Sequence, residues 1–299
     1  MPDEAKKRLE DYKNIIEQKL DEYIPIEYPE KIWESMRYSV LAGGKRLRPT
    51  LCLEACKIIS GNYENAIPTA CAIEMLHSQS LIHDDLPCMD NDDYRRGKPT
   101  NHKVFGEATA VLAGDALLSF APQIILQKTP QIVPRETLLK VLEEYLISAG
   151  ASKLIGGQIV DIDSEGKQIE QATLDYIHQN KTGELFKLAI RSGAILGEAN
   201  EKQLNALTLF AEKFGLAFQI MDDILDVIST LEELGKTPGK DEKHGKVTYV
   251  SFYGLEASKR LLYSLCKEAC DILKSNEIES AVFTEIINSI LNKVKGNNK

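Results

Sequence analysis

The chain has 299 residues, of which 43% are hydrophobic and 27% are charged. This balance supplies enough apolar side chains for a large buried core and argues against intrinsic disorder. The formal net charge of −9 argues against a nucleic-acid-binding surface, because phosphate backbones bind to basic faces.

Neither the N-terminal segment nor the composition points to a membrane. Residues 1–13 contain no apolar signal region, and no stretch reaches the roughly eighteen uninterrupted apolar residues of a membrane span. The six cysteines show no C-x-x-C spacing, so we expect small apolar side chains in a reducing compartment. The sequence therefore predicts a cytoplasmic protein without a membrane span.

Apolar residues recur at intervals of three and four along most of the chain, which is helical spacing. The pattern begins within residues 9–20 and returns over 204–225 as the stripe of one long core helix. No alternating run bounded by turns predicts a sheet. Because no long polar linker divides the chain, we expect one all-α domain over residues 1–299.

The first unusual segment is GGKRLRP, which places Lys45 and Arg48 in a basic run between two glycines and a proline. Such a run is either a solvated helix start or a site for phosphate groups. The segment alone leaves both readings open.

His77 follows Glu74 in a Glu-x-x-His pattern, which di-iron helical bundles use in pairs. The sequence offers only one such pattern, so a di-iron site is disfavoured. His77 lies two helical turns before Asp84, and on a helix both side chains can face the same cavity. A buried structural histidine is the alternative.

The first aspartate cluster reads LIHDDLPCMDNDD. Asp84 and Asp90 are six residues apart, so they do not share a face of one continuous helix. Pro87 disfavours such a helix, because proline lacks a backbone donor and restricts the preceding residue. We therefore expect the helix to end near Asp85 and Asp90 to fold back toward Asp84.

The second aspartate cluster reads FQIMDDILDV. Asp222 and Asp226 are four residues apart and share one helix face, with Gln219 on the same side. Like charges at this spacing destabilise a helix, and a divalent cation removes the conflict. Most neighbouring residues are apolar, so we expect the carboxylates to line a cleft. Ligands that are all oxygen favour magnesium over zinc or iron.

A loop rich in glycine, proline and basic residues follows each cluster, at 91–106 and 235–246. The repetition indicates internal pseudo-symmetry and makes both loops candidates for closure over a site. Basic side chains and metal ions together bind diphosphates. The basic residues available are Arg95 and Arg96 after the first cluster, Lys181 beside Thr182 in NKTGELF, and Lys236 in the second loop.

In this order the motifs resemble those of the trans-isoprenyl diphosphate synthases (polyprenyl synthetases) of the farnesyl and geranylgeranyl type, over nearly the whole chain. The matching segments are GGKRLRP, SLIHDDLPCMDNDDYRRGKPTNHKVFGEATAVLAGDALL, GGQIVD, KTGELF, FQIMDDILDV and LGKTPGKD. The resemblance implies an all-α, single-domain helical bundle around a deep central cavity, usually homodimeric, with up to three magnesium ions. It also implies a short-chain prenyltransferase that joins isopentenyl diphosphate head-to-tail to an allylic diphosphate.

The resemblance implies a role for each matching residue. The residues implied to bind isopentenyl diphosphate are Lys45, Arg48, His77 and Arg96. The allylic diphosphate is implied to bind to magnesium together with Arg95, Lys181 and Lys236. The magnesium ligands, or their close supports, are Asp84, Asp85, Asp90, Asp222, Asp223 and Asp226. The residues implied in catalysis at the cationic centre are Lys181, Thr182 and Gln219.

Product length in this family depends partly on the residues four and five positions before Asp84, which here are Ser80 and Gln79. Farnesyl-forming relatives usually carry an aromatic ring at the position of Gln79, and plastid-like geranylgeranyl-forming relatives usually carry methionine. Gln79 matches neither, but it is about the size of methionine, and its amide needs a hydrogen-bond partner. We therefore expect the C20 product, geranylgeranyl diphosphate, over the C15 product, farnesyl diphosphate.

Two other functions compete with this reading. A class I terpene cyclase or a head-to-head synthase also ionises its substrate with magnesium, but it needs no basic site for isopentenyl diphosphate. The presence of Lys45, Arg48 and Arg96 therefore argues against it. A non-catalytic regulatory subunit would tolerate the loss of aspartates, whereas all six are present.

Overall fold

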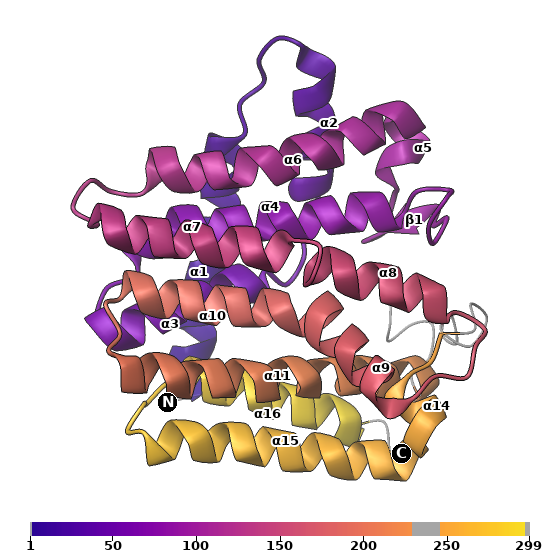
Figure 1. Ribbon diagram of the computed structural model, residues 1–299. Helices are drawn as coiled ribbons and strands as arrows, with labels where there is room; N and C mark the ends of the chain where they lie inside the picture. The colour runs from indigo at the N-terminus through magenta and orange to yellow at the C-terminus, as the bar shows by residue number, and fades with distance from the viewer. Residues whose placement is uncertain (1, 229–245, 297–299) are drawn as a thin grey trace.

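The computed structural model describes residues 2–228 and 246–296, which Figure 1 draws as ribbons. These residues form mostly α-helix, as the apolar periodicity predicts. The longer helices are α1 (Pro2–Tyr23), α2 (Glu30–Val40), α3 (Leu47–Ser60), α4 (Ile67–Asp84), α6 (Glu107–Lys128), α7 (Arg135–Ala149), α8 (Leu154–Ser164), α10 (Glu184–Leu196), α11 (Glu201–Ile228), α15 (Leu255–Ser275) and α16 (Ala281–Gly296). The shorter elements are the 3-10 helix η1 (Glu64–Ala66), α5 (Asn101–Phe105), α9 (Gln171–Ile177), the π-helix η2 (His178–Gly183), α14 (Tyr249–Tyr253) and the strands β1 (Tyr94–Arg95) and β2 (Lys98–Pro99).

The two strands form a small antiparallel hairpin in which Tyr94 pairs with Pro99 and Arg95 pairs with Lys98. The hairpin and the short helix α5 both lie in the segment 91–106, which the sequence predicts as a loop. This segment therefore has more regular structure than expected. One consequence is that the backbone of Arg95 is held in a strand.

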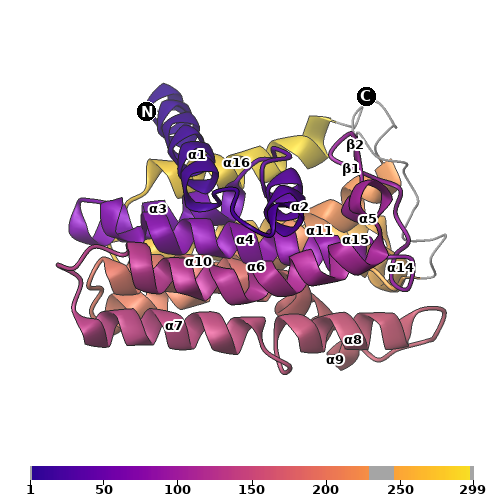
Figure 2. The same ribbon diagram turned by 90° about the horizontal axis from the view of Figure 1, so that it is seen from above.

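Helices α4, α6, α7 and α10 run in roughly the same direction in both views, whereas α1 runs across them (Figure 1, Figure 2). Helix α4 packs along α6 and α3, α10 packs on both α3 and α11, and α11 packs along α15. Aromatic rings fill the space between them, with centroids 5.1 Å apart for Phe186 and Phe214 and 4.8 Å apart for Phe210 and Phe283. Such pairs contribute roughly 0.5–1.5 kcal/mol beyond the area that they bury. The long core helix predicted from the apolar stripe is thus α11.

Helix α6 carries several exposed apolar residues among polar ones. It is the one helix, within the described ranges, that is long and apolar enough to cross a membrane by composition alone. Core helices of globular proteins meet the same criterion, and α6 packs along α4 and against α2. Its outward residues Val111, Leu112 and Leu126 are exposed. The helix is therefore only weak evidence for a membrane span, and it leaves a few large apolar side chains exposed.

Glu54, buried in α3, connects the first and last helices. It accepts hydrogen bonds from the hydroxyl of Tyr12 in α1, at 2.9 Å, and from the hydroxyl of Ser280 just before α16, at 2.7 Å. Helix α16 also packs against α1, α3 and α11. A buried carboxylate with two such partners is satisfied. This contact therefore fixes the start of the C-terminal helix beside α3.

Candidate functional site

A cavity of about 1130 Å³ opens among α4, α6, α8, η2, α11 and α16. The sequence-predicted residues that line it are Lys45, Arg48, His77, Gln79, Ser80, Asp84, Arg95, Arg96, Lys181, Thr182, Gln219 and Asp222. The apolar part of its wall comes from Leu118, Leu154, Ile155, Ile159, Ile162, Leu185, Phe218 and Leu225. Lys236 and most of the segment 235–246 lie outside the described residues. The cavity thus combines acidic, basic and hydrocarbon surfaces.

The chain folds back after α4 as the sequence predicts. Helix α4 ends at Asp84, and the backbone N–H of Asp90 donates to the carbonyl oxygen of Asp84 at 2.8 Å. Burial raises the pKa of Asp84 to about 6, the Lys181 ammonium opposes this shift, and the Asp90 carboxylate adds to it. The charged form of Asp84 is therefore disfavoured in the absence of a cation.

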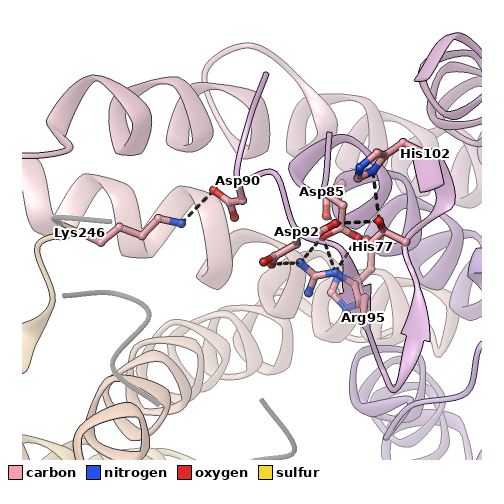
Figure 3. A network of polar contacts seen from close by, with 9 residues as sticks. His77, Asp85, Asp90, Asp92, Arg95, His102 and Lys246 are labelled. Carbon is pink, nitrogen blue, oxygen red and sulfur yellow. Dashed lines mark hydrogen bonds and ion pairs between the residues drawn. The ribbon is translucent and has the colours of Figure 1, made fainter. Parts of the chain in front are cut away.

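The other carboxylates of the first cluster pair with basic side chains (Figure 3). Arg95 donates to Asp85 from Nε at 2.8 Å and from Nη2 at 2.6 Å, and its Nη2 lies 3.7 Å from Asp92. Lys246 reaches from beyond the second cluster and donates to Asp90 at 3.1 Å. Asp84 lines the cavity, whereas neither Asp85 nor Asp90 does.

The three aspartates of α11 have different surroundings. Asp222 lines the cavity. Asp223 is buried and accepts hydrogen bonds at 2.8 Å from the Gln219 amide and at 2.8 Å from the backbone N–H of Tyr249. Asp226 is also buried, and its Oδ1 has no hydrogen-bond partner in the part of the chain that the structure describes. The second cluster therefore presents one carboxylate to the cavity and uses another to hold Gln219 and α14.

Lys181 and Thr182 lie in the π-helix η2, an element often found at functional sites. Lys181 donates to Asp161 of α8 at 2.5 Å, and the hydroxyl of Thr182 donates to Oε1 of Gln219 at 2.7 Å. Gly157 lets α8 approach closely, because a Cβ there would lie 2.4 Å from the backbone nitrogen of Lys181. The predicted pair of Thr182 and Gln219 is thus directly hydrogen-bonded.

The basic residues near α3 and α4 line the cavity beside His77. The guanidinium of Arg48 lies over the ring of Phe186, 4.5 Å from its centroid, and burial lowers the pKa of Arg48 to about 10. Arg96 donates to the carbonyl oxygen of Gly43. Burial, followed by the charges of Arg48 and Arg96, holds the pKa of His77 well below its ordinary value. His77 is therefore neutral at physiological pH and acts there as a polar group instead of a cation.

Gln79 has the hydrogen-bond partner that its position requires. It is 8% exposed, and its amide nitrogen lies 3.1 Å from Nδ1 of His83. Nε2 of His83 lies 3.1 Å from the carbonyl oxygen of Val111 in α6. A carbonyl oxygen only accepts, so Nε2 carries the hydrogen and Nδ1 accepts from Gln79. Gln79 and His83 therefore form one fixed polar unit in the cavity wall, next to Ser80.

The acidic residues fit magnesium only in combination with other ligands. Among the described residues, no three Asp, Glu, His or Cys side chains converge closely enough to hold a metal ion. Asp84 and Asp222 nevertheless both line the cavity, one from α4 and one from α11. Magnesium is commonly bound by one or two carboxylates, with substrate phosphates and water completing an octahedron. This donor set fits that pattern.

Several site residues were not predicted from the sequence. Gln158 and Asp161 belong to the GGQIVD segment, where the Gly-Gly pair signals close packing but no role was assigned. His83 lies four residues after Gln79, a spacing at which helix side chains meet. Asn292 and Lys293 line the cavity from α16, far along the chain from every motif.

Comparison with known proteins agrees with this geometry. Residues 29–287 match the family model described as polyprenyl synthetase. The chain is 52% identical over 271 residues to a dimethylallyltranstransferase of Fischerella ambigua, which covers 89% of this chain and 78% of that protein. It is 50% identical over 262 residues to a geranylgeranyl diphosphate synthase of Cyanophora paradoxa, which covers 87% of each.

Solved structures give the same result. The fold is similar to the crystal structure of an FPP/GFPP synthase from Zymomonas mobilis, with a TM-score of 0.85 and 34% identity over 97% of this chain and 100% of that one. A geranyltransferase from Legionella pneumophila aligns with a TM-score of 0.87 and 28% identity, over 99% of each chain. The chain therefore belongs to the polyprenyl synthetase family, which confirms the resemblance, the all-α fold and the short-chain prenyltransferase function predicted from its sequence.

Proposed function

We propose that this chain is a magnesium-dependent transferase that joins isopentenyl diphosphate head-to-tail to an allylic diphosphate, with geranylgeranyl diphosphate as the product. The single observation that carries the proposal is the composition of the central cavity. Asp84 and Asp222 share it with a set of basic side chains and with a hydrocarbon wall. Two prenyl diphosphates and magnesium together supply the complementary charges and the apolar tails.

The allylic diphosphate lies between the two aspartate clusters. Asp84 and Asp222 would hold the magnesium, while Lys181 in η2 and Arg95 in β1 would bind phosphate oxygens. Magnesium, when bound, stabilises the negative charge of the departing diphosphate. Asp161 and Asp85 orient the two basic side chains, since they accept their hydrogen bonds.

Isopentenyl diphosphate binds at the basic side of the cavity. Lys45, Arg48 and Arg96 supply positive charge, and the neutral His77 supplies a hydrogen bond. Arg48 keeps its charge at neutral pH, because its lowered pKa of about 10 is still well above 7. Charge-assisted hydrogen bonds to phosphate are among the strong ones, so this set fits one diphosphate.

The reacting carbon atoms meet beside Thr182 and Gln219. Ionisation of the carbon–oxygen bond gives an allylic cation, and the homoallylic double bond then attacks it. The hydrogen bond from Thr182 to Gln219 and that from Gln219 to Asp223 fix the oxygen dipoles near this cation. The released diphosphate accepts the proton from the tertiary cation, so no dedicated protein base is required. The apolar wall, including Phe218, keeps water from quenching the cation.

Product length follows from the polar unit of Gln79 and His83. Gln79 is smaller than an aromatic ring, and its amide is satisfied by His83 at 3.1 Å. Gln79 lies five residues before Asp84 on α4, about 7.5 Å along the helix axis, so the growing tail reaches Gln79 after a few carbon atoms. We expect it to pass Gln79 and give the C20 product.

The exposed apolar residues of α6 support a homodimer. Val111, Leu112 and Leu126 are 39%, 58% and 55% exposed, alongside the exposed polar residues Asp115 and Ser119. Large apolar side chains mixed with polar ones on an exposed helix are compatible with a protein–protein interface. Light scattering tests this assembly, with Leu112→Glu expected to yield monomers.

The deciding experiment incubates purified protein with labelled isopentenyl diphosphate and dimethylallyl, geranyl or farnesyl diphosphate, with and without magnesium. The proposal expects magnesium-dependent elongation of each primer and a C20 product. Cyclised or head-to-head products would indicate the alternative enzymes. Failure to consume any primer would indicate a non-catalytic subunit.

A further inference from the structure

Lys293 on the C-terminal helix lies in the cavity wall without an assigned role. Helix α16 presents both Asn292 and Lys293 to the cavity that holds Lys45, Arg48 and Asp222. The buried carboxylate of Glu54 holds the start of α16 against α3, so this placement follows from the packing of the core.

Lys45 and Lys293 line the same two cavities, of about 1130 and 370 Å³, so their side chains share one part of the wall. Burial, followed by the contact with the Lys45 ammonium and by the charge of that group, lowers the pKa of Lys293 to about 8. Within residues 2–228 and 246–296, no carboxylate forms an ion pair with either lysine, although Asp222 favours the charged form of Lys293. Two neighbouring cations repel each other, and this repulsion is larger where water is partly excluded.

A diphosphate removes that conflict, because its negative charges can be shared by both ammonium groups. Lys45 belongs to the basic set assigned to isopentenyl diphosphate, so its neighbour faces the same anion. We propose that Lys293 binds the diphosphate of isopentenyl diphosphate together with Lys45 and Arg48, and so completes this site from the C-terminal helix. The inference rests on the proposed function and adds a residue to it.

A second, smaller cavity of about 370 Å³ also touches Lys45, Phe218 and Lys293. Lys293 therefore lines both the central cavity and this smaller one, and the experiment must show in which of them it binds a ligand. The neighbouring Lys295 is exposed and lines neither cavity, so it provides a matched control on the same helix.

The test compares Lys293→Ala, Lys293→Gln, Lys293→Arg and Lys295→Ala with the wild type in steady-state assays. Isopentenyl diphosphate is varied at saturating primer and magnesium, and the primer is then varied at saturating isopentenyl diphosphate. We expect the Ala and Gln variants to raise KM for isopentenyl diphosphate about tenfold, equivalent to 1.4 kcal/mol. Their kcat and their KM for the primer should stay near wild type, Lys293→Arg should restore binding, and Lys295→Ala should change nothing.

Titration calorimetry of isopentenyl diphosphate alone gives a second readout that needs no turnover, and thermal melting shows whether each variant is folded. Unchanged KM and affinity in both the Ala and Gln variants would overturn the assignment, as would an equal effect on the primer. If the wild type neither binds isopentenyl diphosphate nor elongates a primer, the proposed function itself fails. If the wild type does both and Lys293→Gln matches it, only the role of Lys293 fails.

Discussion

Replacing Gly114 by alanine tests how the polar unit of Gln79 and His83 is held. A Cβ at position 114 would lie 2.0 Å from Nε2 of His83 and 2.4 Å from its Cδ2. Favourable contacts between carbon atoms lie at about 3.5–4.0 Å, so the ring must move by more than about 1 Å. This movement breaks the hydrogen bonds of His83 to Gln79 and to the carbonyl oxygen of Val111.

The expected loss of stability follows from these two contacts. Two hydrogen bonds contribute about 1–3 kcal/mol to the free energy of unfolding, and the buried Gln79 amide loses its partner as well. Alanine gains roughly 1 kcal/mol over glycine through helix propensity, which offsets part of the loss. We therefore expect Gly114→Ala to lower the free energy of unfolding by about 1–2 kcal/mol.

A double-mutant cycle measured by urea unfolding separates this clash from other effects of the substitution. With His83→Ala in the background the ring is absent, so Gly114→Ala should be neutral or stabilise the protein by about 0.5–1 kcal/mol. An equal loss of stability in both backgrounds would show that the contact with His83 is not the cause. Wild-type stability of the single variant would show that the ring moves without cost.

Four further outcomes are expected. Asp84→Ala and Asp222→Ala should each lower turnover by orders of magnitude with an unchanged circular dichroism spectrum. Near-normal turnover in either variant would contradict the proposal that both aspartate clusters are needed. Arg96→Ala should mainly raise KM for isopentenyl diphosphate, and Lys181→Ala should mainly raise KM for the primer. Each rise should correspond to a loss of about 1.5–3 kcal/mol of binding free energy. Equal effects on both substrates would contradict separate sites. The wild type should elongate farnesyl diphosphate and Gln79→Tyr should stop at C15, whereas a wild type that stops at C15 would place the cavity floor elsewhere. In metal-free protein, the contribution of Asp84 to stability is fully present below its ordinary pKa of 3.8 and is lost as the pH rises through about 6. Asp84→Asn should therefore melt at a higher temperature than the wild type at neutral pH, and at the same temperature near pH 3.8. Equal melting temperatures of the two proteins at both pH values would contradict the raised pKa.

Local chemistry made the backbone around the first cluster predictable. Pro87 cannot continue a helix, so α4 had to end near Asp85, and a short return brings Asp90 to the carbonyl oxygen of Asp84. The long helix α11 was equally predictable, because its apolar periodicity is visible within the segment itself and does not depend on other parts of the chain. These features depend on residues close together in the sequence.

The different roles of the aspartates within each cluster were not predictable from the sequence. Asp84 and Asp85 are adjacent in sequence, yet one lines the cavity and the other pairs with Arg95. The outcome depends on the hairpin that carries Arg95, which forms in a segment that reads as a loop. Asp223 likewise binds the backbone of Tyr249, a contact that only the packing of α14 on α11 determines. Tertiary contacts therefore set the roles that the motif leaves equivalent.

Two charged groups of the cavity, Asp84 and Arg48, share an electrostatic property that explains why the cavity attracts two kinds of ligand. Burial shifts the pKa of Asp84 up to about 6 and that of Arg48 down to about 10, so each is moved toward its neutral form. Other charged groups are satisfied internally, both in the cavity, where Arg95 pairs with Asp85, and outside it, where Arg46 lies 2.5 Å from Glu74. In the described part of the chain no such ion pair involves Asp84 or Arg48. A metal ion brings positive charge to the carboxylates and a diphosphate brings negative charge to the cations, so binding the two together relieves both penalties at once.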